Sequence, residues 1–132
     1  MKHLKSFLII VLFLFSLGGF AQTNTKVIAV VTKADWCPTC KVHGSRVVSE
    51  VLPLYNAPQV KIIVNDLTDK QTKATSKAAL VSEGIEKATS KSNTTGEISF
   101  INATTKKIIS KISVAKSNEE IKNAFDEAIL KS

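Results

Sequence analysis

The sequence predicts an α/β domain, a mixed β-sheet flanked by helices, with its elements in the order β-α-β-α-β-β-α. Short β-branched, apolar runs alternate with segments of helical periodicity in the first part of the domain, a pattern typical of parallel strands joined by helices. Two later strand-like runs are separated by a segment of about hairpin length, which indicates an antiparallel pair. A final amphipathic segment predicts a closing helix.

Residues 1–21 are typical of an export signal and not of the folded domain. Lys2 and Lys5 precede the apolar run Phe7–Leu17, and small residues follow where a signal peptidase would cleave. A membrane-spanning helix needs about 20 apolar residues, so this run is too short for a stable span. An uncleaved anchor is the alternative. We expect cleavage to leave a single domain, residues 22–132, that is periplasmic or secreted.

Charge and aromatic content argue against nucleic-acid binding. The full chain has a formal net charge of +7, but its lysines are spread among acidic residues. Nucleic-acid recognition requires a clustered basic face with aromatic partners. After cleavage of the signal the aromatic residues are Trp36, Tyr55, Phe100 and Phe125. We therefore expect a solvated, mixed surface and no nucleic-acid partner.

The first β-α-β unit follows from apolar runs and proline positions. Lys26–Thr32 and Val60–Asn65 are β-branched, apolar runs that predict strands buried on both faces. A helix is expected to begin at Pro38, because proline is favoured at the first helical position. Pro53 cannot continue a regular helix, so we expect the helix to end near Leu52.

The middle of the domain is polar and less clearly patterned. The region 71–95 is rich in Ser, Thr and Lys, and the apolar residues between Ala78 and Ile85 predict a helix inside it. Ser90–Gly96, with the sequence SKSNTTG, predicts a loop.

The last three elements have the clearest signals. Glu97–Ile101 and Lys107–Val114 predict the two strands of the hairpin. Ser117 and Glu120 form a Ser-x-x-Glu capping box, which marks the start of a helix. Its apolar stripe consists of Ile121, Ala124, Phe125, Ala128 and Ile129.

Two cysteines, Cys37 and Cys40, lie where the first strand is expected to meet the first helix. A disulfide between residues this close restricts the unfolded chain very little, so the pair indicates chemistry and not a structural staple. The unpaired N–H groups and partial positive charge of a helix N-terminus favour a thiolate. We expect Cys37 at the N-cap to be exposed and Cys40, one turn in, to be shielded. Cys37 would attack a partner disulfide and Cys40 would resolve the mixed disulfide.

The stretch WCPTC, in this position between strand and helix, resembles the active site of the thioredoxin superfamily. The Pro-Thr dipeptide is similar to that of periplasmic thiol reductases that serve cytochrome c maturation. The resemblance implies a thioredoxin-like fold and thiol–disulfide oxidoreductase activity without a cofactor. It implies protein thiols or disulfides as partners, and an upstream thiol–disulfide electron donor or acceptor. Trp36, Pro38 and Thr39 would contribute to substrate docking.

The chain departs from the family pattern at two positions. Val31 stands where thioredoxins carry a buried acid. No proline occupies the family's cis-proline position, which falls here at Thr95 or Gly96. A cis bond before a non-proline residue costs about 2.5–4 kcal/mol, so we expect a trans peptide there. We expect Thr95 or Gly96 to approach the cysteine pair, with Thr95 in a docking role.

Two alternatives to an oxidoreductase function remain open. Lys33 and Asp35 flank the site, where solvated charges are expected. His43 follows Cys40 by three residues, so Cys37, Cys40 and His43 could form a Zn²⁺ or Cu⁺ site in a metal-binding or carrier module, although a fourth ligand is missing. The second alternative is a non-catalytic interaction protein with the same fold. The haem-attachment signature is absent because Lys41 follows the second cysteine.

Overall fold

A computed structural model describes residues 24–91 and 94–132, so the predicted export signal lies outside the described part. The described residues form a four-stranded mixed sheet with the strand order β2-β1-β3-β4. Central strand β1 pairs parallel with β2 and antiparallel with β3, and β3 pairs antiparallel with β4. The bounds of the strands are Val27–Lys33 for β1, Val60–Asp66 for β2, Glu97–Asn102 for β3 and Ile108–Ser113 for β4.

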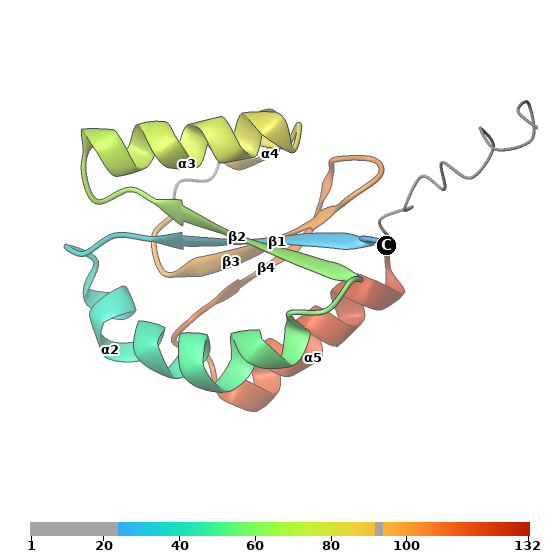
Figure 1. The fold of residues 1–132 in the computed structure, drawn as a ribbon. Coiled ribbons are helices and arrows are strands. Elements are labelled where there is room, and N and C mark those ends of the chain that lie inside the picture. Colours follow the sequence, from blue (N-terminus) through green and yellow to red (C-terminus); the bar gives the residue numbers. More distant parts are fainter. Residues whose placement is uncertain (1–23, 92–93) are drawn as a thin grey trace, which may run out of the picture.

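Helices cover both faces of this sheet (Figure 1). One face carries α2 (Pro38–Arg46), its continuations η2 (Val47–Val51) and η3 (Leu52–Tyr55), and the closing helix α5 (Asn118–Leu130). The opposite face carries α3 (Lys70–Ser82) and the short helix α4 (Glu86–Ser90). This architecture confirms the predicted α/β class with a mixed sheet. Within the described residues, no helix combines the length and apolar character needed to cross a membrane.

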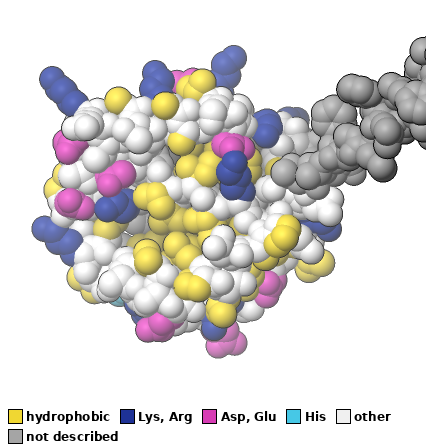
Figure 2. All heavy atoms as spheres, viewed as in Figure 1, with side chains coloured by type: hydrophobic (Ala, Val, Ile, Leu, Met, Phe, Trp, Pro, Cys, Tyr) yellow, Lys and Arg dark blue, Asp and Glu magenta, His cyan; other side chains and the backbone are white. Residues whose placement is uncertain are grey.

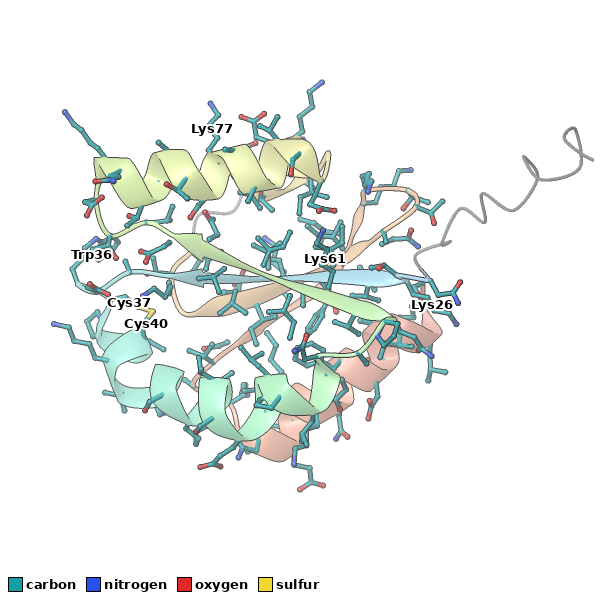
Figure 3. All side chains as sticks on the ribbon, in the orientation of Figure 1. Lys26, Trp36, Cys37, Cys40, Lys61 and Lys77 are labelled. Carbon is teal, nitrogen blue, oxygen red and sulfur yellow. A yellow bond between two sulfur atoms is a disulfide. The ribbon has the colours of Figure 1, made fainter. Side chains whose placement is uncertain are left out.

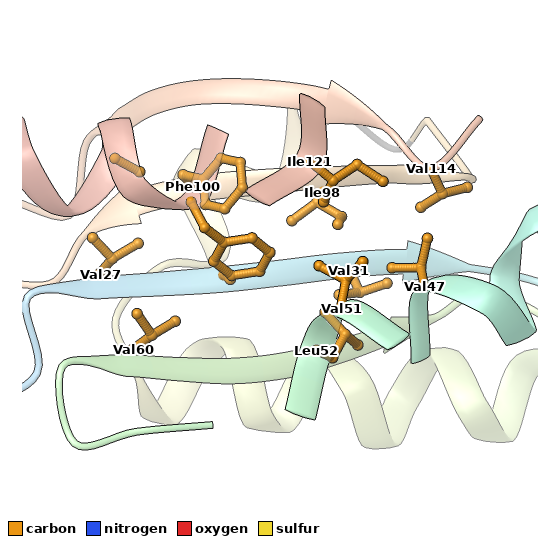
Figure 4. Packing of buried hydrophobic residues seen from close by; sticks show 13 residues of the cluster. Val27, Val31, Val47, Val51, Leu52, Val60, Ile98, Phe100, Val114 and Ile121 are labelled. Carbon is orange, nitrogen blue, oxygen red and sulfur yellow. The ribbon is translucent and has the colours of Figure 1, made fainter. Parts of the chain in front are cut away.

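Strand β1 is buried on both faces, as its apolar run predicts, and it separates two hydrophobic cores. Val27, Ala29 and Val31 pack toward η2 and α5, whereas Ile28 and Val30 pack toward α3. The larger core also contains the aromatic residues Phe100 and Phe125, and Figure 4 shows how its side chains meet between β1, β3 and the helices. The end of β1 is therefore held from two sides, which gives the residues after it a fixed starting point.

Strand β2 forms one edge of the sheet. Figure 2 shows hydrophobic side chains between the two helix layers on the face where β2 runs, and Val64 of this strand is 48% exposed. The exposed Lys61 of β2 pairs with Glu83. A charged side chain on an edge strand opposes pairing with another chain.

The structure differs from the predicted elements in two places. The first helix is α-helical only to Arg46: the π-helical η2 carries it to Val51, close to the expected end near Leu52, and the 3₁₀-helical η3, with Pro53 in its first turn, follows. Proline is tolerated there because a first-turn N–H has no intrahelical partner. The polar middle region holds α4 in addition to the expected helix, because Gly84, with φ of 71°, ends α3 and starts a new turn.

Candidate redox site

The cysteine pair lies at the junction of β1 and α2, as predicted. After β1 the chain turns, and the Cys37 N–H donates to the Ala34 carbonyl over 3.1 Å. Cys37 is the N-cap of α2, and its Sγ accepts a hydrogen bond of 3.2 Å from the Cys40 N–H. The two residues form a disulfide with a Cα–Cα separation of 5.3 Å (Figure 3). The Cys37 sulfur is thus the one in direct contact with a helix N-terminal amide, where negative charge is favoured.

The prediction that Cys37 is exposed and Cys40 shielded is wrong for this disulfide form. Cys37 is only 2% exposed, whereas Cys40 is partly exposed. The physical reason is a contact distant in sequence. A Cβ placed on Gly96 would lie 3.6 Å from Cys37 Sγ and 3.1 Å from the Cγ2 atom of Thr39, the residue between Pro38 and Cys40 in the motif. The backbone at Gly96 therefore covers the first sulfur.

Gly96 is held against the pair by the ends of two strands. Its N–H donates to the Thr32 carbonyl over 2.7 Å, and its carbonyl accepts from the Val114 N–H over 2.9 Å. Its φ of 79° lies in the left-handed region that favours glycine. The described residues contain no cis peptide bond, so the expected trans peptide and the expected approach to the cysteines are both confirmed. Gly96 makes this approach, and the docking role of Thr95 stays a prediction.

A largely apolar groove of about 370 Å³ opens beside Cys40. Its lining includes Val31 from β1, Val47 and Val48 from the helix that follows the pair, and Val114 at the end of β4. Val31, where the family pattern would place an acid, is 7% exposed and belongs to the larger core. The groove therefore offers apolar contact next to Cys40, and Val31 supplies no proton-transfer group there.

A polar network fixes the loop that leads to the cysteines. The Lys33 ammonium lies 3.3 Å from an Asp66 carboxylate oxygen and 3.4 Å from Asp35. Thr68 donates both its N–H and its hydroxyl to Asp66, and its hydroxyl oxygen accepts the Asp35 N–H. Hydrogen bonding to Asp66 raises the pKa of Lys33 despite partial desolvation. Burial works to raise the pKa of Asp66, but the hydrogen bonds from Thr68 and Lys33 outweigh it and leave that pKa lowered.

Sequence reasoning found Lys33 and Asp35 but missed Asp66 and Thr68. Asp35 is indeed well exposed, with 75% of its side chain accessible, but Lys33 is not a free loop charge. The missing information was the register of the parallel pair, in which Lys33 lies beside Asp66. The available signal was that oppositely charged residues, Lys33 and Asp66, directly follow the two strands predicted to pair.

The other predicted site residues fall in different surroundings. Trp36 is 58% exposed, as expected for a docking residue, and Pro38 occupies the first turn of α2 and is exposed. Thr39 is partly buried under Gly96. His43 is partly exposed, and nowhere in the described ranges do three His, Cys, Asp or Glu side chains gather as they would to hold a metal. In this disulfide form Cys37, Cys40 and His43 are not gathered as a metal site, and the metal-binding alternative stays a prediction.

The topology and the position of the pair together decide the fold. A parallel β-α-β unit precedes an antiparallel hairpin and a closing helix, and a Cys-x-x-Cys disulfide caps the helix after the central strand. The fold is thioredoxin-like. No family model and no curated protein matches the chain. The chain is similar to a solved structure described as "Crystal structure of Trxlp from Edwardsiella tarda EIB202", with a TM-score of 0.48 and 18% sequence identity over 83% of this chain and 93% of that chain.

Proposed function

We propose that this thioredoxin-like chain is an exported thiol–disulfide oxidoreductase. The observation that carries the proposal is the Cys37–Cys40 disulfide at the N-terminus of α2, with the Cys37 sulfur accepting the Cys40 N–H. A thiolate at this sulfur would keep that hydrogen bond and gain from the helix dipole. A pair three residues apart also moves from dithiol to disulfide with little change in the rest of the chain.

The exchange proceeds in two balanced steps. In the reduced protein the Cys37 thiolate attacks one sulfur of a partner disulfide, so that an S–S bond forms to Cys37 and the partner's S–S bond breaks. The partner's other sulfur leaves as a thiolate and takes a proton from solvent. The Cys40 thiolate then attacks Cys37 Sγ, which re-forms the Cys37–Cys40 disulfide and releases the second partner thiol. Two electrons pass from the protein to the partner, and a dithiol donor restores the pair by the reverse steps.

Access to the pair favours entry from the groove beside Cys40. In the disulfide form Cys37 is covered by Gly96 and Thr39, whereas Cys40 lines the open apolar groove. A partner segment lying in this groove would contact Cys40 directly and would reach Cys37 once Gly96 or Thr39 moves aside. The apolar lining of the groove suits apolar side chains next to the cysteine of a partner, where that cysteine lies in a loop or an unfolded segment.

Trapping experiments test both the activity and the roles of the cysteines. The Cys40→Ser variant cannot resolve a mixed disulfide, so we expect it to accumulate a covalent adduct with a disulfide substrate through Cys37. The Cys37→Ser variant should form little adduct, and both variants should lose insulin-disulfide reduction. Adduct formation mainly on Cys40 would reverse the assigned roles. An unchanged protein that neither reduces insulin nor forms an adduct would contradict the oxidoreductase proposal.

Export is proposed from the N-terminal sequence. The lysine-flanked apolar run before residue 22 is typical of a signal that directs a chain out of the cytosol. We expect a protein produced in an exporting host to have the mass of residues 22–132. Recovery of a product that retains residues 1–21 would contradict cleavage at this point.

A further inference from the structure

A second cavity lies on the other side of the redox loop from the groove beside Cys40. It measures about 480 Å³ and is bounded by the exposed Trp36, by Leu67 after β2, and by side chains of α3 and α4. Figure 3 places Trp36 on the side of the loop that faces α3, away from the Cys37–Cys40 bond. We propose that this cavity binds an acidic segment of the partner whose cysteines undergo exchange, an inference that rests on the proposed function.

The cavity has a buried polar wall with spare hydrogen-bonding capacity. Asn65 lines it and is 3% exposed, yet the hydrogen bond of its amide is a long one, 3.5 Å from Nδ2 to Thr32 Oγ1. An amide carries two donor hydrogens and an acceptor oxygen, and no other described residue bonds to this one. Among the described residues no buried side-chain nitrogen or oxygen is without a partner, so what Asn65 offers is the second hydrogen of its already bonded amide nitrogen. A carboxylate entering the cavity would accept a hydrogen bond from the Asn65 amide.

Charge favours an acidic occupant over a neutral or basic one. Lys73 and Lys77 of α3 both line the cavity, against the single acid Glu86. Lys77 lies 3.3 Å from Glu86, whereas Lys73 has no acidic partner among the residues that the structure describes. The segment Lys70–Ser90 contains four lysines and two glutamates. Figure 2 shows lysine side chains projecting from the α3/α4 layer at the top of the view. A partner carboxylate would pair with Lys73 without displacing an existing ion pair.

The position of the cavity links it to the chemistry. Trp36 forms part of its wall and is the residue directly before Cys37. A partner segment that crosses the redox loop from the groove beside Cys40 could place its cysteine at the pair and an acidic side chain, a few residues away in the partner, between Trp36 and Lys73. Leu67 and Leu80 would contact the methylene groups of a Glu side chain. The cavity would thus select partners by the charge beside their cysteines.

Paired peptides test the charge preference. Two disulfide peptides are compared that differ only in carrying Glu or Lys at the positions flanking the cysteine. We expect the reduced protein to react about three- to fivefold faster with the Glu peptide at low salt, the size expected for an exposed ion pair, and the difference to shrink in salt. Lys73→Glu should abolish or reverse the preference. Lys87→Glu is the matched control, because Lys87 lies on α4 with the same charge change but does not line the cavity.

Binding without chemistry separates this proposal from the proposed function. A cysteine-free Glu peptide is titrated into the Cys37→Ser/Cys40→Ser protein, and the emission of Trp36, the single tryptophan, is followed. A saturable change that Lys73→Glu weakens and Lys87→Glu leaves unaltered supports docking, even if exchange activity is absent. Exchange at equal rates with both peptides, or an emission unchanged by the Glu peptide, overturns the acidic-segment proposal while leaving the oxidoreductase intact.

Discussion

Gly96 is the residue on which the surroundings of the first sulfur depend. Its backbone bonds to Thr32 and Val114 fix it between the ends of β1 and β4, and its lack of a side chain lets it lie against Cys37 and Thr39. A larger residue would have to move the cysteine loop or the strand end. Gly96 thus covers the first sulfur with backbone atoms alone.

We expect Gly96→Ala to destabilise the oxidised protein in two ways. Alanine in the left-handed region costs about 1–2 kcal/mol, and its Cβ would approach Thr39 Cγ2 to 3.1 Å. Gly84→Ala is the matched control, because its φ of 71° is similar but its nearest neighbour would be a flexible Lys106 atom at 3.8 Å. Urea unfolding should show a clearly larger loss for Gly96→Ala. Equal losses would mean that the contact with Thr39 carries no cost.

Residue positions show what the sequence does and does not contain. Cys37 as N-cap follows from Pro38, which fixes where α2 begins. The burial of Cys37 does not follow, because it depends on Gly96, which is distant in the chain and is placed by strand pairing. Likewise, the Lys33–Asp66 pair depends on the register between two strands. Local sequence signals determine the position of a residue within its helix or strand. Strand pairing between distant segments determines which residues bury its side chain.

At the scale of elements, one arginine joins the end of α2 to the connection between β4 and α5. The Arg46 guanidinium donates to the Val114 and Lys116 carbonyls, both over 2.8 Å, and to the Asn118 side chain. Val114 in turn holds Gly96. The helix that carries the cysteines is thereby connected through Val114 to the residue that covers them.

We expect Arg46→Ala to lower the free energy of unfolding by about 2 kcal/mol, because hydrogen bonds from a charged donor contribute about 1.5–3 kcal/mol and Arg46 is partly exposed. Arg46→Lys keeps the positive charge but loses the planar guanidinium with its several N–H donors. It should therefore recover less than half of the stability that Arg46→Ala loses. Lys41→Ala on the same helix is the control, with a change within about 0.5 kcal/mol. Full recovery by lysine would show that charge, and not the guanidinium geometry, is what matters.

The Tyr55 hydroxyl of η3 donates hydrogen bonds to Lys122 and Asp126 of α5. From its raised pKa we predict a loss of stability at high pH. Desolvation, and then its hydrogen bond to Asp126, raise the pKa of Tyr55 to about 12 from 10. The stabilisation is complete below pH 10, and it is lost as the pH rises toward 12, because the unfolded chain then ionises first. Tyr55→Phe should flatten this decline. As the single tyrosine, Tyr55 can be titrated directly by its ultraviolet absorbance. A midpoint near 10 would contradict the raised pKa.

The elements themselves were largely predictable. The four strands, α2, α3 and α5 follow from apolar runs, Pro38 and the Ser117–Glu120 capping box, which the structure contains. The π-helical η2 did not follow, because its residues have the same apolar spacing as an ordinary helix. The capping box of α3 was also missed, since Asp69 pairs there with Thr72 and not with the usual Glu or Gln.

At the scale of the whole molecule, β1 makes the two cores a single cooperative unit. Its alternate side chains belong to the core under η2 and α5 and to the core under α3. In the larger core Phe125 stacks on Tyr55 with ring centroids 4.2 Å apart and meets Phe100 edge-on at 4.8 Å. Loss of order in either core would remove one wall of β1, and with it the support of the redox loop at its end.

Core substitutions on opposite faces should therefore lower the same unfolding transition. Phe125→Leu removes two ring contacts from the larger core, and Leu80→Ala leaves a cavity in the smaller one, for which we expect losses of about 1–2 and about 2–4 kcal/mol. Trp36 emission reports on the redox loop, and far-ultraviolet circular dichroism reports on the whole backbone. In both variants the two signals should change at the same urea concentration, as in a two-state protein. If Leu80→Ala shifted the Trp36 transition but not the circular dichroism transition, the α3/α4 layer would unfold separately, and β1 would not couple the two cores.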